Sequence, residues 1–288
     1  MTNEQIVSCI SQALDYIRVN LDRPLTTEEI ADHCRFSRFH FSRMFRGVVG
    51  ESLYACTRRL RLERAAYRLR TNPRLTVTEA ALDAGYSPSN FATAFREQFG
   101  MSASAFRSSG AIAPMLERDR LLAYLERMRA DPDALGRIRE TVQIRTMQPM
   151  RLHYRRHIGP YVRLHQFWKR FSAECATAGL VEPDSRWVGI SYDDPLVTEA
   201  NRCMYDMCLE MRTPPPPPCH AIEGGLYACL PFEGTGEYIA EAYNDLMALW
   251  MPDSPYMPDN RPVLEMYEAC SVPGGPMRLQ LCLPLVEA

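Results

Sequence analysis

Apolar residues along the first hundred positions recur at helical spacing. In the leading segment they fall every three or four residues, at Ile6, Ile10, Leu14, Ile17 and Leu21. This spacing predicts an amphipathic helix. Further on, the chain matches itself at a constant offset of fifty residues from Thr26 to Ser102, with no gap. Self-similarity at one fixed offset indicates a duplicated structural unit.

Each copy of the repeat carries the signals of two short helices. The pairs Thr26/Glu29 and Thr76/Glu79 have the S/T-x-x-E spacing of a capping box, which predicts a helix that starts at each Thr. A second helix is predicted in each copy after a Ser, over Arg38 to Arg46 and over Pro88 to Glu97. Helix, tight turn and helix together form a helix-turn-helix unit.

The second helix of each copy has an apolar side. Phe41 and Phe45 lie four residues apart on one face, as do Phe91 and Phe95 in the other copy. We expect these faces to pack in the core and the opposite faces to stay exposed. Between the copies, Ser52 to Arg70 contains neither Pro nor Gly, which predicts one connecting helix. A rigid connector would hold the two exposed faces about one turn of DNA, ~34 Å, apart.

The pattern changes beyond residue 107. Residues 108–141 are polar, with helical spacing and a break at Asp131-Pro132-Asp133, which predicts a helical linker. Strand, helix, strand and strand follow, first at Val142 to Tyr154, Val162 to Ala178, Trp187 to Ser191 and Arg202 to Glu210. The same order is predicted again at Gly225 to Phe232, Glu237 to Trp250, Pro262 to Tyr267 and Met277 to Pro284. Between the two sets, Pro214 to Pro218 is an extended spacer or a docking site for a proline-recognition module.

The predicted fold is therefore multidomain. An all-α double helix-turn-helix domain spans residues 1–107, and an α+β domain of two βαββ repeats spans residues 142–288. The helical linker of residues 108–141 joins them.

Charge divides the chain at the same place. Residues 1–107 carry fifteen Arg against eleven Asp and Glu, a net charge of +4, whereas the remainder has a net charge of −6. Ten of these Arg lie between Arg35 and Arg70, and the whole chain has a single Lys, Lys169. The planar guanidinium group suits phosphates and guanine edges, so the basic half favours a nucleic-acid partner over a merely solvated surface.

Metal, cofactor and membrane are not indicated. The ten Cys include no C-x-x-C pair, and no cluster of His and Cys has zinc spacing, so we expect no metal site and no cofactor. No secretory leader opens the sequence, and no apolar run is long enough to cross a bilayer. We therefore expect a cytoplasmic protein with reduced thiols and no membrane partner.

The duplicated segment resembles the DNA-binding domain of the AraC family. The matching stretches are Leu25-Thr-Thr-Glu-Glu-Ile-Ala, Phe36 through Arg46, Gly85-Tyr-Ser and Phe91-Ala-Thr-Ala-Phe-Arg, within about residues 5–107. The resemblance implies that the exposed sides of both second helices bind double-stranded DNA. The implied contact residues are Arg38, Phe39, Ser42, Arg43, Arg46, Ser89, Asn90, Thr93 and Arg96.

The two recognition helices differ in chemistry. Arg43 is the best candidate for a base contact, because Arg pairs bidentately with guanine, and Phe39 could meet a thymine methyl group. The second copy has short side chains at the matching positions, so we expect it mainly to position the protein on phosphates. Phe39 could instead pack between helices. A solvated helix face is the alternative for Arg58, Arg59, Arg61 and Arg64.

The C-terminal half resembles the GyrI-like domain, which also occurs in drug-sensing regulators. The matching stretches are His157-Ile-Gly-Pro-Tyr161, Gly189-Ile-Ser-Tyr-Asp-Asp-Pro195, Tyr205-Asp-Met-Cys208, Gly224-Gly-Leu-Tyr227 and Glu265-Met-Tyr267. The resemblance implies two βαββ halves around a concave groove. It also implies that this groove binds bulky, often lipophilic or cationic small molecules.

Glu265 supports such a site on chemical grounds. In a strand, Glu265 and Tyr267 share one face while Leu264 and Met266 share the other. If Leu264 and Met266 face the helices, Glu265 and Tyr267 face the groove, where a carboxylate among aromatic rings suits an organic cation. Candidate walls are Tyr161, Trp168, Trp187, Tyr192, Tyr227, Trp250 and Tyr256. Each aromatic could instead pack in the core, and Glu265 could be an exposed strand charge.

Together these features predict a sequence-specific transcription regulator, an activator with no catalytic residues, that acts as a monomer or a dimer. A small-molecule effector, a lipophilic cation, would change how the N-terminal domain engages DNA or RNA polymerase. Two alternatives stay open. Glu265 could be the general acid/base of a GyrI-like small-molecule hydrolase, although no Ser/His/Asp order, metal cluster or phosphate loop supports it. The chain could also inhibit a partner protein directly, with DNA binding secondary.

Overall fold

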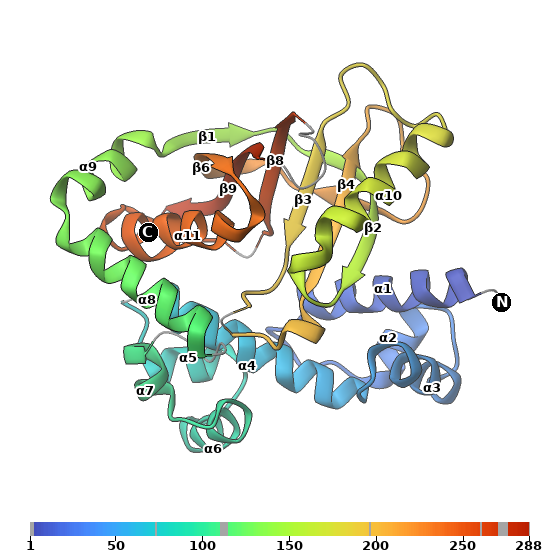
Figure 1. The fold of residues 1–288 in the computed structure, drawn as a ribbon. Helices are drawn as coiled ribbons and strands as arrows, with labels where there is room; N and C mark the ends of the chain where they lie inside the picture. Colours follow the sequence, from blue (N-terminus) through green and yellow to red (C-terminus); the bar gives the residue numbers. More distant parts are fainter. Residues whose placement is uncertain are drawn as a thin grey trace. The chain divides into compact units, whose positions relative to one another are not determined.

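The computed structural model describes residues 3–72, 74–109, 115–195, 197–259, 261–269 and 276–287. The chain divides into two compact units, Met1–Gly110 and Ala111–Ala288. Figure 1 shows the first unit as helices only and the second as a large sheet with helices. This arrangement confirms the predicted fold class of an all-α part followed by an α+β part.

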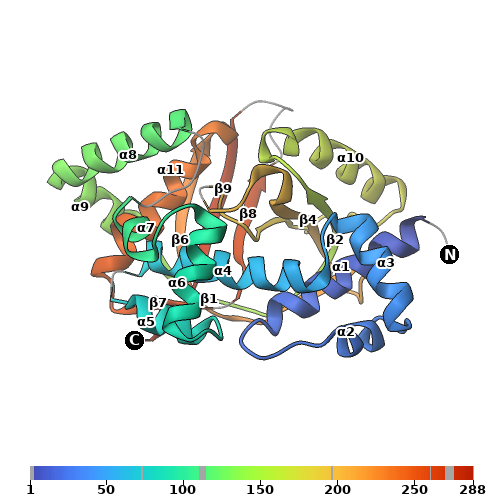
Figure 2. The same cartoon turned by 90° about the horizontal axis from the view of Figure 1, so that it is seen from below.

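The first unit contains the predicted duplication. Its helices are α1 Asn3–Val19, α2 Thr27–His33, α3 Arg38–Val49, α4 Leu53–Thr71, α5 Val77–Asp83, α6 Pro88–Phe99 and α7 Ala103–Ser109. The helices α2 and α5 start fifty residues apart, and α3 and α6 share that offset at both ends. Each copy is therefore a helix-turn-helix, and α4 is the predicted connecting helix (Figure 2).

Local signals fix the ends of these helices. Thr26 caps α2 by accepting a hydrogen bond from the Glu29 amide, and Thr76 and Glu79 form a complete capping box at α5. The helices α3 and α6 end at Gly50 and Gly100, whose φ angles of 83° and 70° suit glycine. The phenylalanines that were predicted to pack are all fully buried: Phe41, Phe45, Phe91 and Phe95.

The arginines of α4 do not form one solvated face. The Arg59 side chain is 11% exposed and forms ion pairs with Glu51 and Glu63, at 2.6 and 2.9 Å. Arg61 donates from Nε to the Leu21 carbonyl at 2.9 Å, and Arg58 pairs with Glu97 of α6. These side chains hold the connecting helix against its neighbours, so part of the basic charge stabilises the unit.

The second unit is one antiparallel sheet with its helices. The strands are β1 Gln143–Met147, β2 Met150–Ile158, β3 Trp187–Ser191, β4 Met204–Glu210, β5 Cys219–Ile222, β6 Gly225–Gly234, β7 Tyr256–Pro258, β8 Val263–Ala269 and β9 Met277–Glu287. The main helices are α8 Met115–Ala130, α9 Pro132–Thr141, α10 Leu164–Thr177 and α11 Ile239–Asn244. Short helical segments are η1 Tyr161–Arg163, η2 Ala200–Arg202, η3 Gly236–Tyr238, the π-helix η4 Asp245–Trp250 and η5 Met251–Asp253.

The sheet order shows the two predicted βαββ repeats. Strands follow one another as β1-β6-β9-β8-β3-β4-β2-β5, with β7 paired to β9. One repeat supplies β2, α10, β3 and β4, and the other supplies β6, α11, β8 and β9. The repeats meet where β3 pairs with β8, so the centre of the sheet is built from both.

Some elements differ from the prediction. The segment Val142 to Tyr154 is two strands that lie toward opposite ends of the sheet, because β1 pairs with β6 and β2 pairs with β4 and β5. Pro149 lies between them and has no N–H for a strand ladder. The prediction also missed β5 and β7, which have four and three residues and are too short for a periodicity to show.

The helices α8 and α9, which were expected in a linker, are packed within the second unit. Tyr124 of α8 donates a hydrogen bond to Asp245 at 2.6 Å, and Ala134 and Ile138 of α9 are buried. The segment therefore makes tertiary contacts of its own, which its polar sequence concealed.

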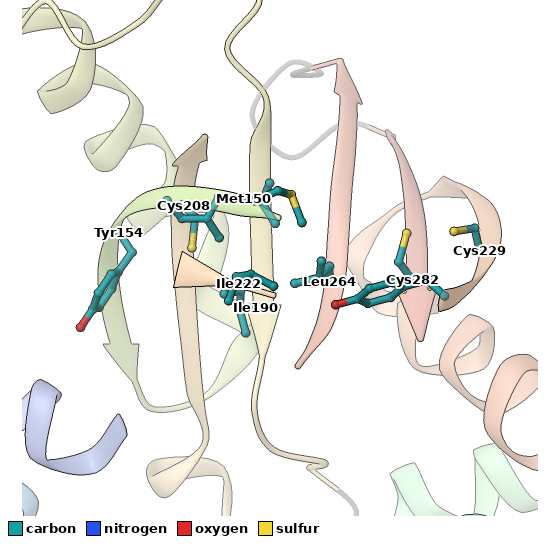
Figure 3. Close-up of a cluster of buried hydrophobic side chains, with 11 residues drawn as sticks. Met150, Tyr154, Ile190, Cys208, Ile222, Cys229, Leu264 and Cys282 are labelled. Carbon is teal, nitrogen blue, oxygen red and sulfur yellow. The ribbon is translucent and has the colours of Figure 1, made fainter. Parts of the chain in front are cut away.

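The two faces of the sheet have different neighbours. Helix α10 packs through Phe171 and Cys175 onto Tyr205, Met207 and Leu209 of β4. Helix α11 lies on the same face, beside β6 and β9 (Figure 1). The opposite face carries a second apolar cluster that contains Ile190, Cys208, Leu264 and Cys282 (Figure 3). Both faces of the central strands are therefore buried.

Candidate nucleic-acid interface and effector site

The exposed side of α3 carries the predicted basic residues. Arg38, Ser42, Arg43 and Arg46 are exposed while Phe41 and Phe45 are buried, and the side chain of Phe39 lies outside the described residues. Arg38 forms an ion pair with Glu28 of α2. Among the described side chains, neither Arg43 nor Arg46 forms an ion pair. These two guanidinium groups are available to phosphates or base edges.

The exposed side of α6 is different in chemistry. Ser89, Asn90, Thr93 and Arg96 are exposed there. The Thr93 hydroxyl donates to the Ser89 carbonyl at 3.3 Å, and the Ser87 hydroxyl, which caps the helix, accepts from the backbone N–H of Asn90 at 3.4 Å. Short side chains that bond to their own helix project little, and Arg96 is the long basic group of this face. The helix α4 between the motifs has 19 residues, which corresponds to about 28 Å of helix.

In the second unit, Glu265 lies on β8 at the centre of the sheet and is 4% exposed. Its Oε2 atom accepts hydrogen bonds from the hydroxyls of Tyr205, at 2.5 Å, and Tyr267, at 2.9 Å. Its Oε1 atom accepts one from the Tyr243 hydroxyl at 3.0 Å. One carboxylate thus takes three phenolic donors, from β4, β8 and α11. Among the described residues, no Arg, Lys or His forms an ion pair with it.

The electrostatics of this group follow from its burial. Burial raises the pKa of Glu265 above its ordinary value, although the three tyrosine hydroxyls act in the opposite direction. Burial and the nearby Glu265 also raise the pKa of Tyr205 and Tyr243, so both remain hydrogen-bond donors. A buried carboxylate without a basic partner among the described residues is costly, and a weakly hydrated cation that reached it would lower this cost.

A glycine makes this arrangement possible. Gly189 of β3 is the register partner of Glu265. A Cβ atom at Gly189 would lie 1.9 Å from the Tyr205 hydroxyl oxygen and 2.9 Å from Glu265 Oε2. The missing side chain therefore gives the Tyr205 hydroxyl its path to the carboxylate.

Further aromatic rings surround these tyrosines. The ring of Trp168 on α10 lies 5.1 Å from that of Tyr267, and Trp187 lies 6.2 Å from Trp168. Tyr161 packs edge-on against Tyr205 at 5.8 Å and donates to the Met204 carbonyl. The structure thus brings Tyr161, Trp168, Trp187 and Tyr267 together beside Glu265. The buried Nε1 atom of Trp168 has no hydrogen-bond partner among the described residues.

Other predicted wall residues lie elsewhere. Tyr227 is fully buried in the cluster on the opposite face, with its ring under the Arg261 guanidinium group. Tyr192 bonds to Asp206, which also lies on that face in a buried ion pair with Arg156. These two predictions are wrong because alternate residues of a strand point to opposite faces.

Neither Trp250 nor Tyr256 takes part in the described hydrogen bonds or ring contacts of the Glu265 site. Trp250 ends the π-helix η4 and is buried. Tyr256 pairs with Glu287, six positions along β9 from the register partner of Glu265, which is about 20 Å in a strand. The structure therefore does not place either ring beside the site.

The predicted orientation of β8 was also wrong. Leu264 and Met266 pack on the face away from α10 and α11, and Glu265 and Tyr267 point toward the helices. Burial of both faces explains the error, because a buried strand gives no sign of which face the helices cover. Tyr205 and Tyr243 were missed. Tyr205 stands in a stretch that carried the family resemblance, and that was its only signal in the sequence.

No group of three or more His, Cys, Asp or Glu in the described parts of the chain is arranged to hold a metal ion. Among the described helices, none has the length and apolar character of a membrane span. The Glu265 site consists of one carboxylate, hydroxyl donors and aromatic rings. Such a set suits an organic cation better than a hard metal ion, which prefers several oxygen ligands.

Two family models match this chain. The GyrI-like small molecule binding domain matches residues 140–286, and a helix-turn-helix domain matches residues 30–109. The regulatory protein SoxS of Salmonella typhimurium is 32% identical over 108 residues, which cover 37% of this chain and 97% of SoxS. The chain belongs to the AraC family and has a GyrI-like domain.

Other relatives of this AraC-family protein match the same part. The HTH-type transcriptional activator AarP of Providencia stuartii is 37% identical over 103 residues, which cover 35% of this chain and 76% of AarP. A solved structure of a probable AraC family transcriptional regulator from Rhodopseudomonas palustris has 31% identity and a TM-score of 0.33. It covers 35% of this chain and 94% of its own. DNA-binding transcription regulation is thus the activity of the family to which the first unit belongs.

Proposed function

We propose that this DNA-binding transcription regulator senses a bulky organic cation, which binds at Glu265 and activates transcription. The buried, triply hydrogen-bonded carboxylate with no basic partner among the described residues carries the proposal. The match of residues 140–286 to a small molecule binding domain supports it. The similarity to AarP, an HTH-type transcriptional activator, supports the sign of regulation.

The preference for a bulky organic cation follows from two free energies, the cost of removing the charges from water and the gain from pairing them. A buried carboxylate has lost its hydration, and a bulky organic cation is weakly hydrated, so little further desolvation opposes their contact. The neighbouring tyrosine and tryptophan rings add cation–π attraction, worth up to about 2 kcal/mol each when desolvated. A small, strongly hydrated cation would lose more on entering than it gains.

On the DNA side, we propose that α3 supplies most base recognition and α6 mainly positions the protein. Arg43 and Arg46 of α3 form no ion pair among the described side chains, whereas the α6 face has Thr93 where α3 has Arg43. Guanidinium groups read guanine edges, while hydroxyls and backbone amides suit phosphates. The effector would then change how the first unit engages DNA or RNA polymerase.

A thermal-shift experiment on the full chain tests the effector class. The probes are tetraphenylphosphonium and tetraphenylborate, which have nearly the same shape and opposite charge. We expect tetraphenylphosphonium to stabilise the wild type and tetraphenylborate to have no effect. Removing one member of a buried charge pair costs about 2–5 kcal/mol, so Glu265→Gln should weaken tetraphenylphosphonium binding about 30-fold or more.

Glu268→Gln is the matched control, because Glu268 stands on the same strand but is exposed and bonds to Gln280. We expect this variant to bind the probe as the wild type does. Equal stabilisation by tetraphenylphosphonium and tetraphenylborate would contradict a cation site at Glu265. An equal loss of probe affinity in Glu265→Gln and Glu268→Gln would also contradict it.

The hydrolase alternative makes a different prediction. A hydrolase would convert bound esters or amides, and Glu265→Gln would abolish that conversion. We expect no turnover of such compounds by the purified protein in mass spectrometry. The described site contains tyrosine hydroxyls and aromatic rings around Glu265 but no Ser or Cys nucleophile paired with a His base.

A further inference from the structure

Helix α11 and the first turn of η4 are held from two sides. Tyr243, in the last turn of α11, donates to Glu265 in the sheet at 3.0 Å. Asp245, the first residue of η4, accepts a hydrogen bond of 2.6 Å from Tyr124 of α8. The two residues are separated only by Asn244, which is buried and bonds to the Ala240 carbonyl. One short piece of helix thus contacts both the effector site and α8.

The helical geometry makes this a direct connection. Successive residues of a helix are about 100° apart, so Tyr243 and Asp245 point to nearly opposite sides. A shift or rotation of the helix that moves one side chain must move the other. The π-helix η4 begins at Asp245. Such wide turns are rare and frequently found at functional sites, because they alter the register of the helix.

Helix α8 is the first helix of the second unit and follows the DNA-binding unit along the chain. Tyr124 is partly buried and is flanked by Arg127, whose guanidinium group lies 5.5 Å from its ring. Burial and the carboxylate of Asp245 raise the pKa of Tyr124, so its hydroxyl remains a donor. Helix α8 therefore connects the two units along the chain. A change in its packing changes this connection.

We propose that α11 relays the occupancy of the Glu265 site to α8 through Tyr243 and Asp245. This inference rests on the proposed effector site. A cation that pairs with the Glu265 carboxylate competes with the Tyr243 hydroxyl for Oε1. Release of Tyr243 removes the hydrogen bond between α11 and Glu265, so the helix can shift on the sheet, and the Tyr124–Asp245 contact changes with it.

The three tyrosines at Glu265 are not equivalent in this respect. Tyr205 and Tyr267 stand on β4 and β8, whose positions are fixed by ladders on both sides. Tyr243 stands on α11, a helix that contacts α8. Tyr267→Phe is therefore a matched control for Tyr243→Phe, since each removes one hydroxyl from the same carboxylate.

The first test uses hydrogen–deuterium exchange on the ligand-free full chain and needs no effector. We expect Tyr243→Phe to accelerate exchange of the α8 amides of residues 123–130 about fivefold or more, as for a coupling between linked sites. The amides of α10 should be unaffected, which excludes general destabilisation. Tyr267→Phe should leave α8 within about twofold of the wild type. Equal effects of both variants on α8, or no effect of Tyr243→Phe, would overturn the relay.

The second test adds tetraphenylphosphonium. We expect the probe to change α8 exchange in the wild type and to leave it unchanged in Tyr243→Phe. Coupling is reciprocal, so Tyr124→Phe, which removes a docking contact of α8, should also change the affinity for the probe. A probe that binds without changing α8 would overturn the relay and leave the effector site intact. If the probe does not bind, the proposed cation site fails, and the ligand-free comparison still decides the relay.

Discussion

The substitution Gly189→Ala tests whether the tyrosine cage of Glu265 depends on a missing side chain. The new Cβ atom would lie 1.9 Å from the Tyr205 hydroxyl oxygen, and ordinary contacts begin at 3.4 Å. The hydroxyl must therefore move by about 1.5 Å, which takes it out of hydrogen-bond range of Glu265 in most directions.

The expected loss of stability combines two effects. Overpacking a core position costs about 1–3 kcal/mol, and a hydrogen bond to a charged group contributes about 1.5–3 kcal/mol. One movement of Tyr205 causes both, so the terms overlap, and we expect a loss of about 2–4 kcal/mol. The double variant Gly189→Ala/Tyr205→Phe lacks the atom at 1.9 Å, so the alanine should cost at least about 1 kcal/mol less in that background.

Urea unfolding followed by tryptophan fluorescence measures this effect, because all three Trp lie in the second unit. Gly136→Ala in α9 is the control, since a Cβ there would meet nothing within 4 Å. Alanine is the better helix former, so the control should gain up to about 1 kcal/mol. If Gly189→Ala were as stable as Gly136→Ala, the proposed path for the Tyr205 hydroxyl would be wrong.

Further predictions concern DNA recognition and pH. In selection from randomised duplexes, Arg43→Ala should change the preferred sequence, and Thr93→Ala should preserve it with a weaker affinity; the reverse pattern would refute the assignment of roles to α3 and α6. Protonation of Glu265, whose pKa burial raises, should weaken cation binding as pH falls, and calorimetry should show no such dependence in Glu265→Gln. Burial alone would raise the pKa of Asp206, but Arg156 and His220 lower it to about 2. Because the ordinary value is 3.8, Asp206 should stabilise the second unit above about pH 4 and lose that contribution toward pH 2, and an identical acid-unfolding curve for Asp206→Asn would contradict this.

The DNA-binding half was predicted from sequence in detail because its signals are local. The capping pairs at Thr26 and Thr76, the glycines that end α3 and α6, and the spacing of the phenylalanines each act within one or two helical turns. The duplication then supplied the same information twice. The ion pairs of the α4 arginines could not be predicted from sequence. A helical pattern does not show which charges meet acidic partners such as Glu51.

In the C-terminal half, the order of strands and helices was predictable from sequence, but which face of the sheet the helices cover was not. Six of the seven residues of β4 are buried, so the strand shows no alternation that could label its faces. The same applies to β8, where the apolar Leu264 and the acidic Glu265 are both buried, on opposite faces. For this reason the sequence did not show that Glu265, rather than Leu264 and Met266, points toward the helices.

The hydrogen-bond donors to Glu265 that were predicted and those that were missed differ in their distance from it along the chain. Tyr267, two residues from Glu265, shares its strand and its face, so alternation alone predicts it. Tyr243 is 22 residues away and Tyr205 is 60 residues away, and each reaches the carboxylate only through helix packing or strand register. The role of Gly189 depends on the same strand register, because a missing side chain matters there only when the Tyr205 hydroxyl lies beside it. The sequence therefore singles out Glu265 as a candidate, whereas the donors that hold its carboxylate in place, Tyr243 among them, depend on helix packing and on the long-range pairing of the two repeats.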